Sequence, residues 1–180
     1  MDSSTLKPGL SYEFKFKIPE NKTVPFLYPE ASEFQVMPRV FATGFMVGLF
    51  EWTCIQAINP YLDWPSEQTV GTDVKLSHSA ATPPGLIVTV KIKLEKIEGR
   101  KLTFSIIADD GVEKISEGTH ERFIINAAKF NAKAEAKADR AEAKVDRAEA
   151  KVDRSEAKVD RAEAKADRTE AKVDSVRNTI

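Results

Sequence analysis

Hydrophobic and polar residues alternate in several segments of the first 131 residues, and this pattern predicts an antiparallel sheet. Between Leu10 and Ile18 every second residue is apolar, which is typical of a strand with one buried face. Glu98-Gly99 and Asp110-Gly111 are hairpin turn signals between later strand-like runs. The later strands are expected at Gly71–Ala80, Gly85–Ile97, Lys101–Ala108 and Glu113–Asn126.

One helix is expected between the first strand and the later ones. The segment Val40–Pro60 is apolar on nearly every side, and the pair Asn59-Pro60 ends it. A helix of this kind is expected to be buried on every side. Before it, the four prolines from Pro19 to Pro38 predict an ordered loop or broken helical turns. The sequence therefore predicts an α+β domain in which an antiparallel sheet covers one apolar helix.

The C-terminal segment has a different pattern. From Ala134 to Asp174 a seven-residue unit close to AEAKVDR recurs without glycine or proline, and its residues are strong helix formers. With Val145 at heptad position a and Ala148 at d, a strict seven-residue period predicts a left-handed supercoil if two helices pair. Since every aromatic residue lies at or before Phe130, we expect a globular domain at residues 1–131 and a helix at residues 132–180.

The charges of this repeat favour one orientation of pairing. In a parallel pair, Lys144 at position g faces Glu149 at position e of the neighbour, whereas an antiparallel pair brings like charges together. Against pairing, the alanine-rich seam buries little area. Like charges four residues apart, such as Glu149 with Asp153 and Arg147 with Lys151, also weaken the helix. Two interpretations stay open: a parallel homo-oligomeric coiled coil and a solvated, partly frayed single helix.

Composition narrows the class of protein. The 27 basic and 28 acidic residues give a net charge of -1, so no basic field favours nucleic acid or a membrane surface as a partner. The first ten residues do not have the pattern of a secretory signal, and no apolar stretch is long enough to span a bilayer. Cys54 is the only cysteine, so it forms no internal disulfide, and its neighbours favour a small buried hydrophobe. We therefore expect a cytoplasmic protein.

The apolar helix carries a single acidic residue, Glu51, between Phe50 and Trp52. An ionised carboxylate in such a helix is costly unless it is paired or protonated, which makes Glu51 a candidate catalytic residue. The alternative is a glutamate that reaches the surface at the helix edge. Gly44 and Gly48 lie on the same face and allow a ligand or another backbone to approach closely.

Two histidines and one threonine complete the candidates. His78 is expected on the strand Gly71–Ala80, and a structural role is the simpler interpretation for it and for His120. Thr43 precedes the apolar helix, where an N-cap is the default role, and its hydroxyl needs an adjacent base to become a nucleophile. On one regular helix, Thr43 and Glu51 would lie about 12 Å apart along the axis. We expect no metal or cofactor because no such motif is present. The residues indicate a Thr/Glu/His hydrolase.

Residues 7–131 resemble the fluoroacetyl-CoA thioesterase family, a branch of the hot-dog fold enzymes. The likeness rests on five segments in order: KTVPFLYPE, VFATGFMVGLFEW, GTDVKLSHSAATPPG, GTHERF and KFNAK. The resemblance implies a hot-dog fold, in which an antiparallel sheet wraps around a central helix, and a homodimer. The heptad tail has no counterpart in the family pattern, and it could support a higher homo-oligomer.

The resemblance also implies roles for particular residues. Thr43, Glu51 and His78 occupy the family's catalytic positions. Gly71 would offer its backbone N–H to the acyl group or its oxyanion, and Arg122 would line the same pocket.

The resemblance further implies an aromatic lid over the acyl group. Phe34 is present, but the second lid position holds Met37, whose flexible thioether packs a small pocket less rigidly than a ring. We therefore expect a thioesterase that hydrolyses a short, fluoroacetyl-CoA-like acyl-CoA to the free acid and CoA, with weakened fluoroacetyl selectivity. The alternatives are a non-catalytic acyl-CoA-binding module and an assembly protein whose coiled-coil tail is its main function.

Overall fold

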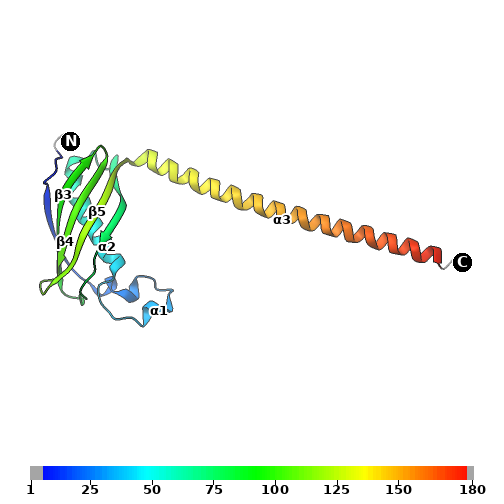
Figure 1. Ribbon diagram of the computed structural model, residues 1–180, viewed down its shortest axis with the longest axis horizontal. Coiled ribbons are helices and arrows are strands. Elements are labelled where there is room, and N and C mark those ends of the chain that lie inside the picture. The colour runs from blue at the N-terminus through cyan, green and yellow to red at the C-terminus, as the bar shows by residue number, and fades with distance from the viewer. Residues whose placement is uncertain (1–5, 178–180) are drawn as a thin grey trace. The chain divides into compact units, whose positions relative to one another are not determined.

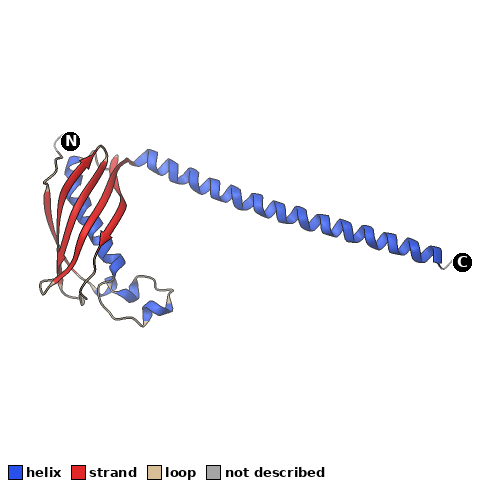
Figure 2. Ribbon diagram, in the orientation of Figure 1, coloured by secondary structure: helices blue, strands red, loops and turns tan. Residues whose placement is uncertain are grey.

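The computed structural model describes the backbone of residues 6–177 and the side chains of residues 6–156 and 158. It contains a five-stranded antiparallel sheet with a helix, α2, along one face (Figures 1 and 2). The elements in chain order are β1 (Ser11–Lys17), η2 (Glu20–Lys22), η3 (Val24–Phe26), α1 (Ser32–Gln35), α2 (Thr43–Ile58), η4 (Asn59–Tyr61), β2 (Glu67–Leu76), β3 (Ile87–Glu98), β4 (Lys101–Asp109), β5 (Lys114–Asn126) and α3 (Ala127–Arg177).

The strands lie in the order β1-β3-β4-β5-β2, and every neighbouring pair is antiparallel. Gly99 and Gly111 have φ angles of 61° and 88°, which side-chain-bearing residues rarely adopt. They form the tight connections of the β3–β4 and β4–β5 hairpins, as the sequence predicts. Strands β1 and β2 are the two edges of the sheet.

The predicted α+β order of one strand, one helix and four strands is confirmed, but the position of β2 differs from the prediction. The strand begins at Glu67 because its first residues pair with the end of β5, where Glu67 lies opposite Asn126. It ends at Leu76, so the prediction that His78 lies on the strand is wrong. His78 lies in the connection that follows, between Ser77 and Ser79, whose backbone N–H groups still donate to the carbonyl oxygens of Glu117 and Ile115 on β5.

Helix α2 is buried on one face and exposed on the other, so the prediction of burial on every side is wrong for the single chain. Trp52 on the outer face is 45% exposed, and Gly44 and Gly48 beside it are also exposed. One sheet can cover only one face of a helix. The buried residues of α2 are Met46, Leu49, Phe50, Thr53, Cys54, Ala57 and Ile58.

The inner face of the sheet supplies the other half of the core. Alternate residues of β3 and β4 pack against α2, as the period-two pattern predicts. Cys54 is fully buried, and burial raises the pKa of its thiol to about 12. The interpretation of Cys54 as a small core hydrophobe fits this position. The prolines between β1 and α2 break the chain into the short turns η2, η3 and α1, as expected.

The C-terminal segment is a continuous helix, α3, which confirms the predicted helix. The chain divides into two compact units, Met1–Lys129 and Phe130–Ile180. Every residue from 131 to 156 is exposed, and Val145 and Val152 of the predicted seam are 56% and 54% exposed. Among residues 6–177, no helix has the length and apolar character needed to cross a membrane.

Candidate active site

The hydroxyl of Thr43 forms a pair with the imidazole of His78. Thr43 is the first residue of α2, and its Oγ1 lies 2.8 Å from His78 Nδ1. The N-cap position belongs to Ala42, so the default role of Thr43 as an N-cap is wrong. A backbone hydrogen bond of 2.8 Å from Phe41 N to Thr82 O ties the start of α2 to the segment after His78. The pair therefore joins two segments that are fixed independently of it.

His78 is suited to accept a proton. Burial lowers its pKa from the ordinary value of 6.5, so the imidazole is neutral at pH 7. If Nδ1 accepts a hydrogen bond from the Thr43 hydroxyl, the ring proton is carried by Nε2. Within the described residues, His78 Nε2 is buried and has no hydrogen-bond partner. Such a donor carries a desolvation cost, which a bound ligand could relieve.

A second group of polar residues surrounds Glu51. Its Oε1 lies 3.7 Å from Arg122 Nη1 and 3.9 Å from His120 Nε2. The Glu51 side chain is 39% exposed, so it lies at the edge of the buried face of α2 and not within it. A buried guanidinium neutralises much of the cost of placing a carboxylate on an apolar helix. The nearest imidazole to this carboxylate is that of His120.

Gly71 on β2 makes room for the Glu51 carboxylate. A Cβ atom on Gly71 would overlap Glu51 Oε1 and would lie 3.1 Å from His120 Cε1. The register between β2 and β5 shifts between Gly71 and Asp73, which marks a β-bulge beside the carboxylate. The sheet therefore brings a side-chain-free position and an irregular backbone directly against Glu51.

Sequence analysis did not identify His120 and Thr69 as site residues. His120 and Arg122 are 1% and 2% exposed, and both point from β5 toward the inside of the fold. Arg122 donates from Nε to Thr69 Oγ1 at 2.9 Å and from Nη2 to Thr69 O at 2.8 Å. The signal in the sequence was the segment GTHERF, in which strand alternation places His120 and Arg122 on the same face.

The structure brings the candidate residues together in two groups rather than one. Thr43 lies with His78, and Glu51 lies with Gly71 and Arg122. Thr43 and Glu51 are eight residues apart on one regular helix, which separates them by about 12 Å along its axis. Thr43 and Glu51 are therefore both on α2, but they cannot hydrogen-bond to each other within one chain.

The two predicted lid residues lie in and just after α1. The rings of Phe34 and Tyr28 stack with their centroids 5.9 Å apart, and Met37 is 44% exposed. The same region approaches the first turn of α2, because Leu27 Cδ1 would lie 2.9 Å from a Cβ on Gly44. The lid role of Phe34 and Met37 stays a prediction.

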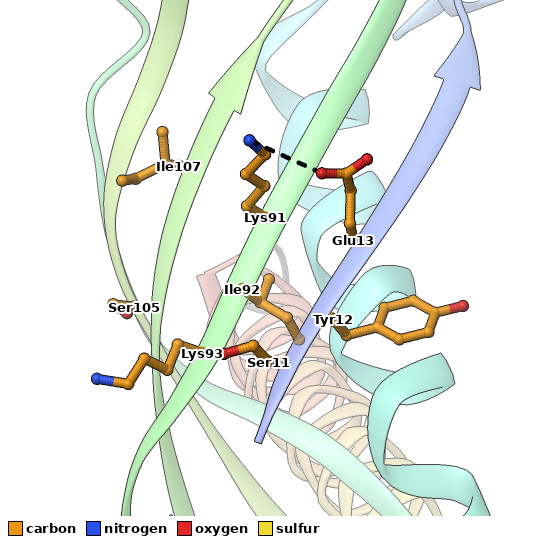
Figure 3. A pocket seen from close by; sticks show the side chains of 8 residues that line it. All are labelled: Ser11, Tyr12, Glu13, Lys91, Ile92, Lys93, Ser105 and Ile107. Atoms are coloured by element: carbon orange, nitrogen blue, oxygen red, sulfur yellow. Dashed lines mark ion pairs between the residues drawn. The ribbon is translucent and has the colours of Figure 1, made fainter. Parts of the chain in front are cut away.

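One hollow of the globular unit lies on α2 and another lies on the sheet. One of about 260 Å³ lies on the outer face of α2. It is lined by Phe16, Lys22, Phe41, Gly44, Phe45, Gly48, Leu49 and Trp52. A larger one of about 550 Å³ lies against β1, β3 and β4 (Figure 3). There Lys91 and Glu13 form an ion pair of 3.7 Å, and Tyr12 points toward α2. Thr43, His78 and Glu51 line neither of the two hollows. Among the described residues, no cluster of three His, Cys, Asp or Glu could hold a metal ion.

Comparison with known proteins gives one consistent result. A family model described as fluoroacetyl-CoA-specific thioesterase matches residues 23–128. The fluoroacetyl-CoA thioesterase of Streptantibioticus cattleyicolor is 51% identical over 132 residues, which are 73% of this chain and 94% of that protein.

Solved structures of thioesterases are also similar to this chain. A structure of the fluoroacetyl-CoA thioesterase FlK has a TM-score of 0.72 and 51% identity, over 73% of this chain and 97% of that chain. A Thermus thermophilus protein described as a thioesterase superfamily member has a TM-score of 0.65 and 29% identity, over 76% of this chain and 96% of that chain. These relatives extend over the globular unit of the present chain.

Proposed function

The chain belongs to the family of fluoroacetyl-CoA-specific thioesterases, and we propose that its own substrate is the CoA thioester of a short carboxylic acid. It has the hot-dog fold and is an acyl-CoA thioester hydrolase, which adds water across the C–S bond to give an acid and free CoA. FlK structures at about this level of similarity contain fluoroacetate or acetyl-CoA. The observation that carries the proposal is the 2.8 Å contact between Thr43 Oγ1 and His78 Nδ1.

His78 is the proposed general base or acid. Its Nδ1 can take a proton from the Thr43 hydroxyl, or from a water molecule in the same place. The oxygen then attacks the thioester carbonyl carbon, the C–S bond breaks, and the imidazolium returns the proton to the CoA sulfur. Attack by water gives the free acid directly, whereas attack by Thr43 leaves an acyl ester on its hydroxyl, which water then hydrolyses with His78 again as the base. The lowered pKa of His78 keeps the imidazole in its proton-accepting form at neutral pH.

Glu51 is the proposed second catalytic group. Its carboxylate lies 3.7 Å from the Arg122 guanidinium, and it can activate water or displace the CoA thiolate from the thioester to give a transient anhydride, which water then hydrolyses. The backbone N–H of Gly71 is the proposed oxyanion donor, since an edge strand has N–H groups without a strand partner. Arg122 is 2% exposed in the single chain and is proposed to act on Glu51, while its place in the lining of the acyl pocket stays a prediction.

We propose a homodimer in which a second copy of the chain covers the outer face of α2. This face is apolar, holds the 260 Å³ hollow, and includes an exposed Trp52 and a Gly48 with no atom within 4 Å of its Cβ position. Strand β2 beside it is a free edge. A second copy could bring its Glu51 to the Thr43–His78 pair of the first copy. The two groups would then meet although Thr43 and Glu51 of one chain lie about 12 Å apart along α2.

The substrate proposal is tested by steady-state hydrolysis with purified full-length protein. Acetyl-CoA and fluoroacetyl-CoA are compared, and the release of the CoA thiol is followed. We expect turnover of both, with a modest preference for fluoroacetyl-CoA, because Met37 packs a small acyl group less rigidly than phenylalanine does. Met37→Phe is the matched variant and is expected to raise the preference. Binding without turnover of either thioester would favour the non-catalytic binding module instead.

The tail is proposed to be a parallel coiled coil with a second copy. Acidic residues recur at heptad positions b and e, basic residues recur at c and g, and the a/d seam lies between these two stripes. Within one helix each stripe repels itself at spacings of three and four residues. In a parallel pair the acidic stripe of each helix lies beside the basic stripe of the other, so pairing offsets the repulsion. Val145 and Val152, which are more than half exposed in the single chain, are then covered.

Cysteine crosslinking tests the tail in the full-length protein. Val152→Cys places a thiol at position a, and Ala150→Cys is the matched control at position f, on the far side of the helix. Buried Cys54 does not compete because its pKa is about 12. We expect disulfide-linked dimers for Val152→Cys under mild oxidation and few for Ala150→Cys, since only paired a positions come within disulfide reach. Equal crosslinking of both variants would favour the single helix.

A cytoplasmic location is also proposed. The single cysteine is buried and free, and intracellular CoA thioesters would be available there as substrates.

A further inference from the structure

The imidazole of His120 lies inside the site but takes no part in the Thr43–His78 pair. It lies on β5 and is 1% exposed, and both of its ring nitrogens have hydrogen-bond partners. Its Nδ1 lies 2.8 Å from the carbonyl oxygen of Asp73, next to the β-bulge of β2. Its Nε2 lies 3.0 Å from Nη1 of Arg122. The side chain therefore links the irregular backbone of β2 to the guanidinium that faces Glu51.

These two partners determine the protonation state of His120. A carbonyl oxygen can only accept, so Nδ1 carries the proton and donates it. A guanidinium can only donate, so Nε2 must accept from Arg122. The imidazole is thus neutral and in the Nδ1–H tautomer. Burial lowers its pKa, and the nearby charge of Arg122 acts in the same direction.

Each of the three nitrogen atoms of the Arg122 guanidinium has a hydrogen-bond partner. Its Nε and Nη2 are bonded to Thr69, and its Nη1 is bonded to His120. The distance from Nη1 to Glu51 Oε1 is 3.7 Å, which allows charge attraction but exceeds the range of about 2.7–3.2 Å for an N–H···O hydrogen bond. Arg122 therefore stabilises the charge of the carboxylate without occupying its oxygen.

We propose that His120 is a positioning residue that acts through Arg122. Its Nε2 holds the guanidinium at ion-pairing distance from Glu51, which leaves the carboxylate oxygens free to engage water or the thioester. This inference rests on the proposed role of Glu51. The charged groups that face His120 are Asp73 from β2, Glu51 from α2 and Arg122 on β5 itself.

Loss of the acceptor on His120 has a defined consequence. The guanidinium then keeps only its two bonds to Thr69 and can shift toward Glu51, where Nη1 forms a charge-assisted hydrogen bond with the carboxylate. A carboxylate oxygen that accepts this bond is less available to water or the thioester. We expect turnover to fall about tenfold or more, with little change in KM.

Two amide substitutions separate the two ring nitrogens in the full-length enzyme. His120→Asn keeps a donor for Asp73 O but does not reach Arg122, whereas His120→Gln extends an acceptor to the position of Nε2. The kcat and KM for acetyl-CoA hydrolysis are measured for both across the pH range, together with their unfolding in urea. The inference predicts reduced kcat with nearly unchanged KM for His120→Asn, and substantial recovery of kcat for His120→Gln.

The result that overturns the inference is a folded His120→Asn enzyme with the kcat and pH profile of the unmodified protein. Equal losses in both variants, in proportion to their loss of stability, overturn it as well, since they indicate a structural role only. Glu51→Gln is measured alongside. Full activity in that variant removes the proposed function of the carboxylate, whereas reduced activity with normal His120→Asn behaviour removes only the role of His120.

A measurement on the unmodified protein applies even if His120→Asn does not fold. Nitrogen-15 NMR of the imidazole rings distinguishes the two neutral tautomers and the imidazolium. We expect the neutral Nδ1–H form for His120 at pH 7. The Nε2–H form, or an imidazolium, would contradict the inference because neither can accept from Arg122.

Discussion

Gly71→Ala is expected to lower kcat for acyl-CoA hydrolysis about a hundredfold while leaving the protein folded. An alanine Cβ at this position would overlap Glu51 Oε1, so the carboxylate has to move away from β2 and Arg122. The backbone of Gly71 does not have a positive φ angle, so alanine adds no backbone strain there. The main effect is therefore expected to pass through Glu51, and the ring of His120, 3.1 Å from the added Cβ, is the other side chain that has to shift. Steady-state kinetics and urea unfolding of the full-length variant measure the two quantities.

A double-mutant comparison gives the control for this prediction. In a Glu51→Gln background the carboxylate has already been lost, so adding Gly71→Ala is expected to have little further effect on kcat. If the fold-losses in kcat of the two single variants multiply in the double variant, alanine at Gly71 acts by another route, such as a displaced oxyanion N–H. Wild-type kcat in Gly71→Ala alone would mean that the position of the carboxylate is not important.

Glu51→Gln and His78→Ala are each expected to lower kcat at least about a hundredfold. Glutamine preserves the shape of the side chain but removes the charge that faces Arg122, and alanine removes the base that lies next to Thr43. The KM for acyl-CoA is expected to change less than kcat, because both groups act on the reacting bond. Turnover close to wild type in both variants would remove the catalytic assignment.

Most of the fold was predictable because its signals are local. Period-two alternation identified β1 and β3, the strand-like runs after the two hairpin turn signals identified β4 and β5, and the apolar run identified α2. The start of β2 was missed because its first residues, from Glu67, have no alternating pattern and are held by pairing with β5. The exposed face of α2 was also missed, since hydrophobicity shows that a face needs a cover but not whether the same chain supplies it.

The candidate site was less predictable, for a reason of sequence distance. Thr43 and His78 are 35 positions apart, and the residues alone gave no indication that they pair at 2.8 Å. The resemblance to a family indicated these positions, and the structure then supplied the contact. His120 was assigned only a structural role because its partners, Asp73 and Arg122, meet it through strand pairing. A side chain that acts on another side chain leaves little local signal.

Complementation between the Glu51→Gln and His78→Ala chains tests the central claim most directly, because it asks whether the two groups form one active site across two copies. Each chain carries a different affinity tag, and the mixed species is purified after co-expression. If Glu51 of one copy serves the Thr43–His78 pair of the other, a mixed dimer has one intact site and one doubly altered site. We predict about half of the wild-type kcat per dimer from two nearly inactive parents. A mixed dimer as inactive as its parents would contradict the account.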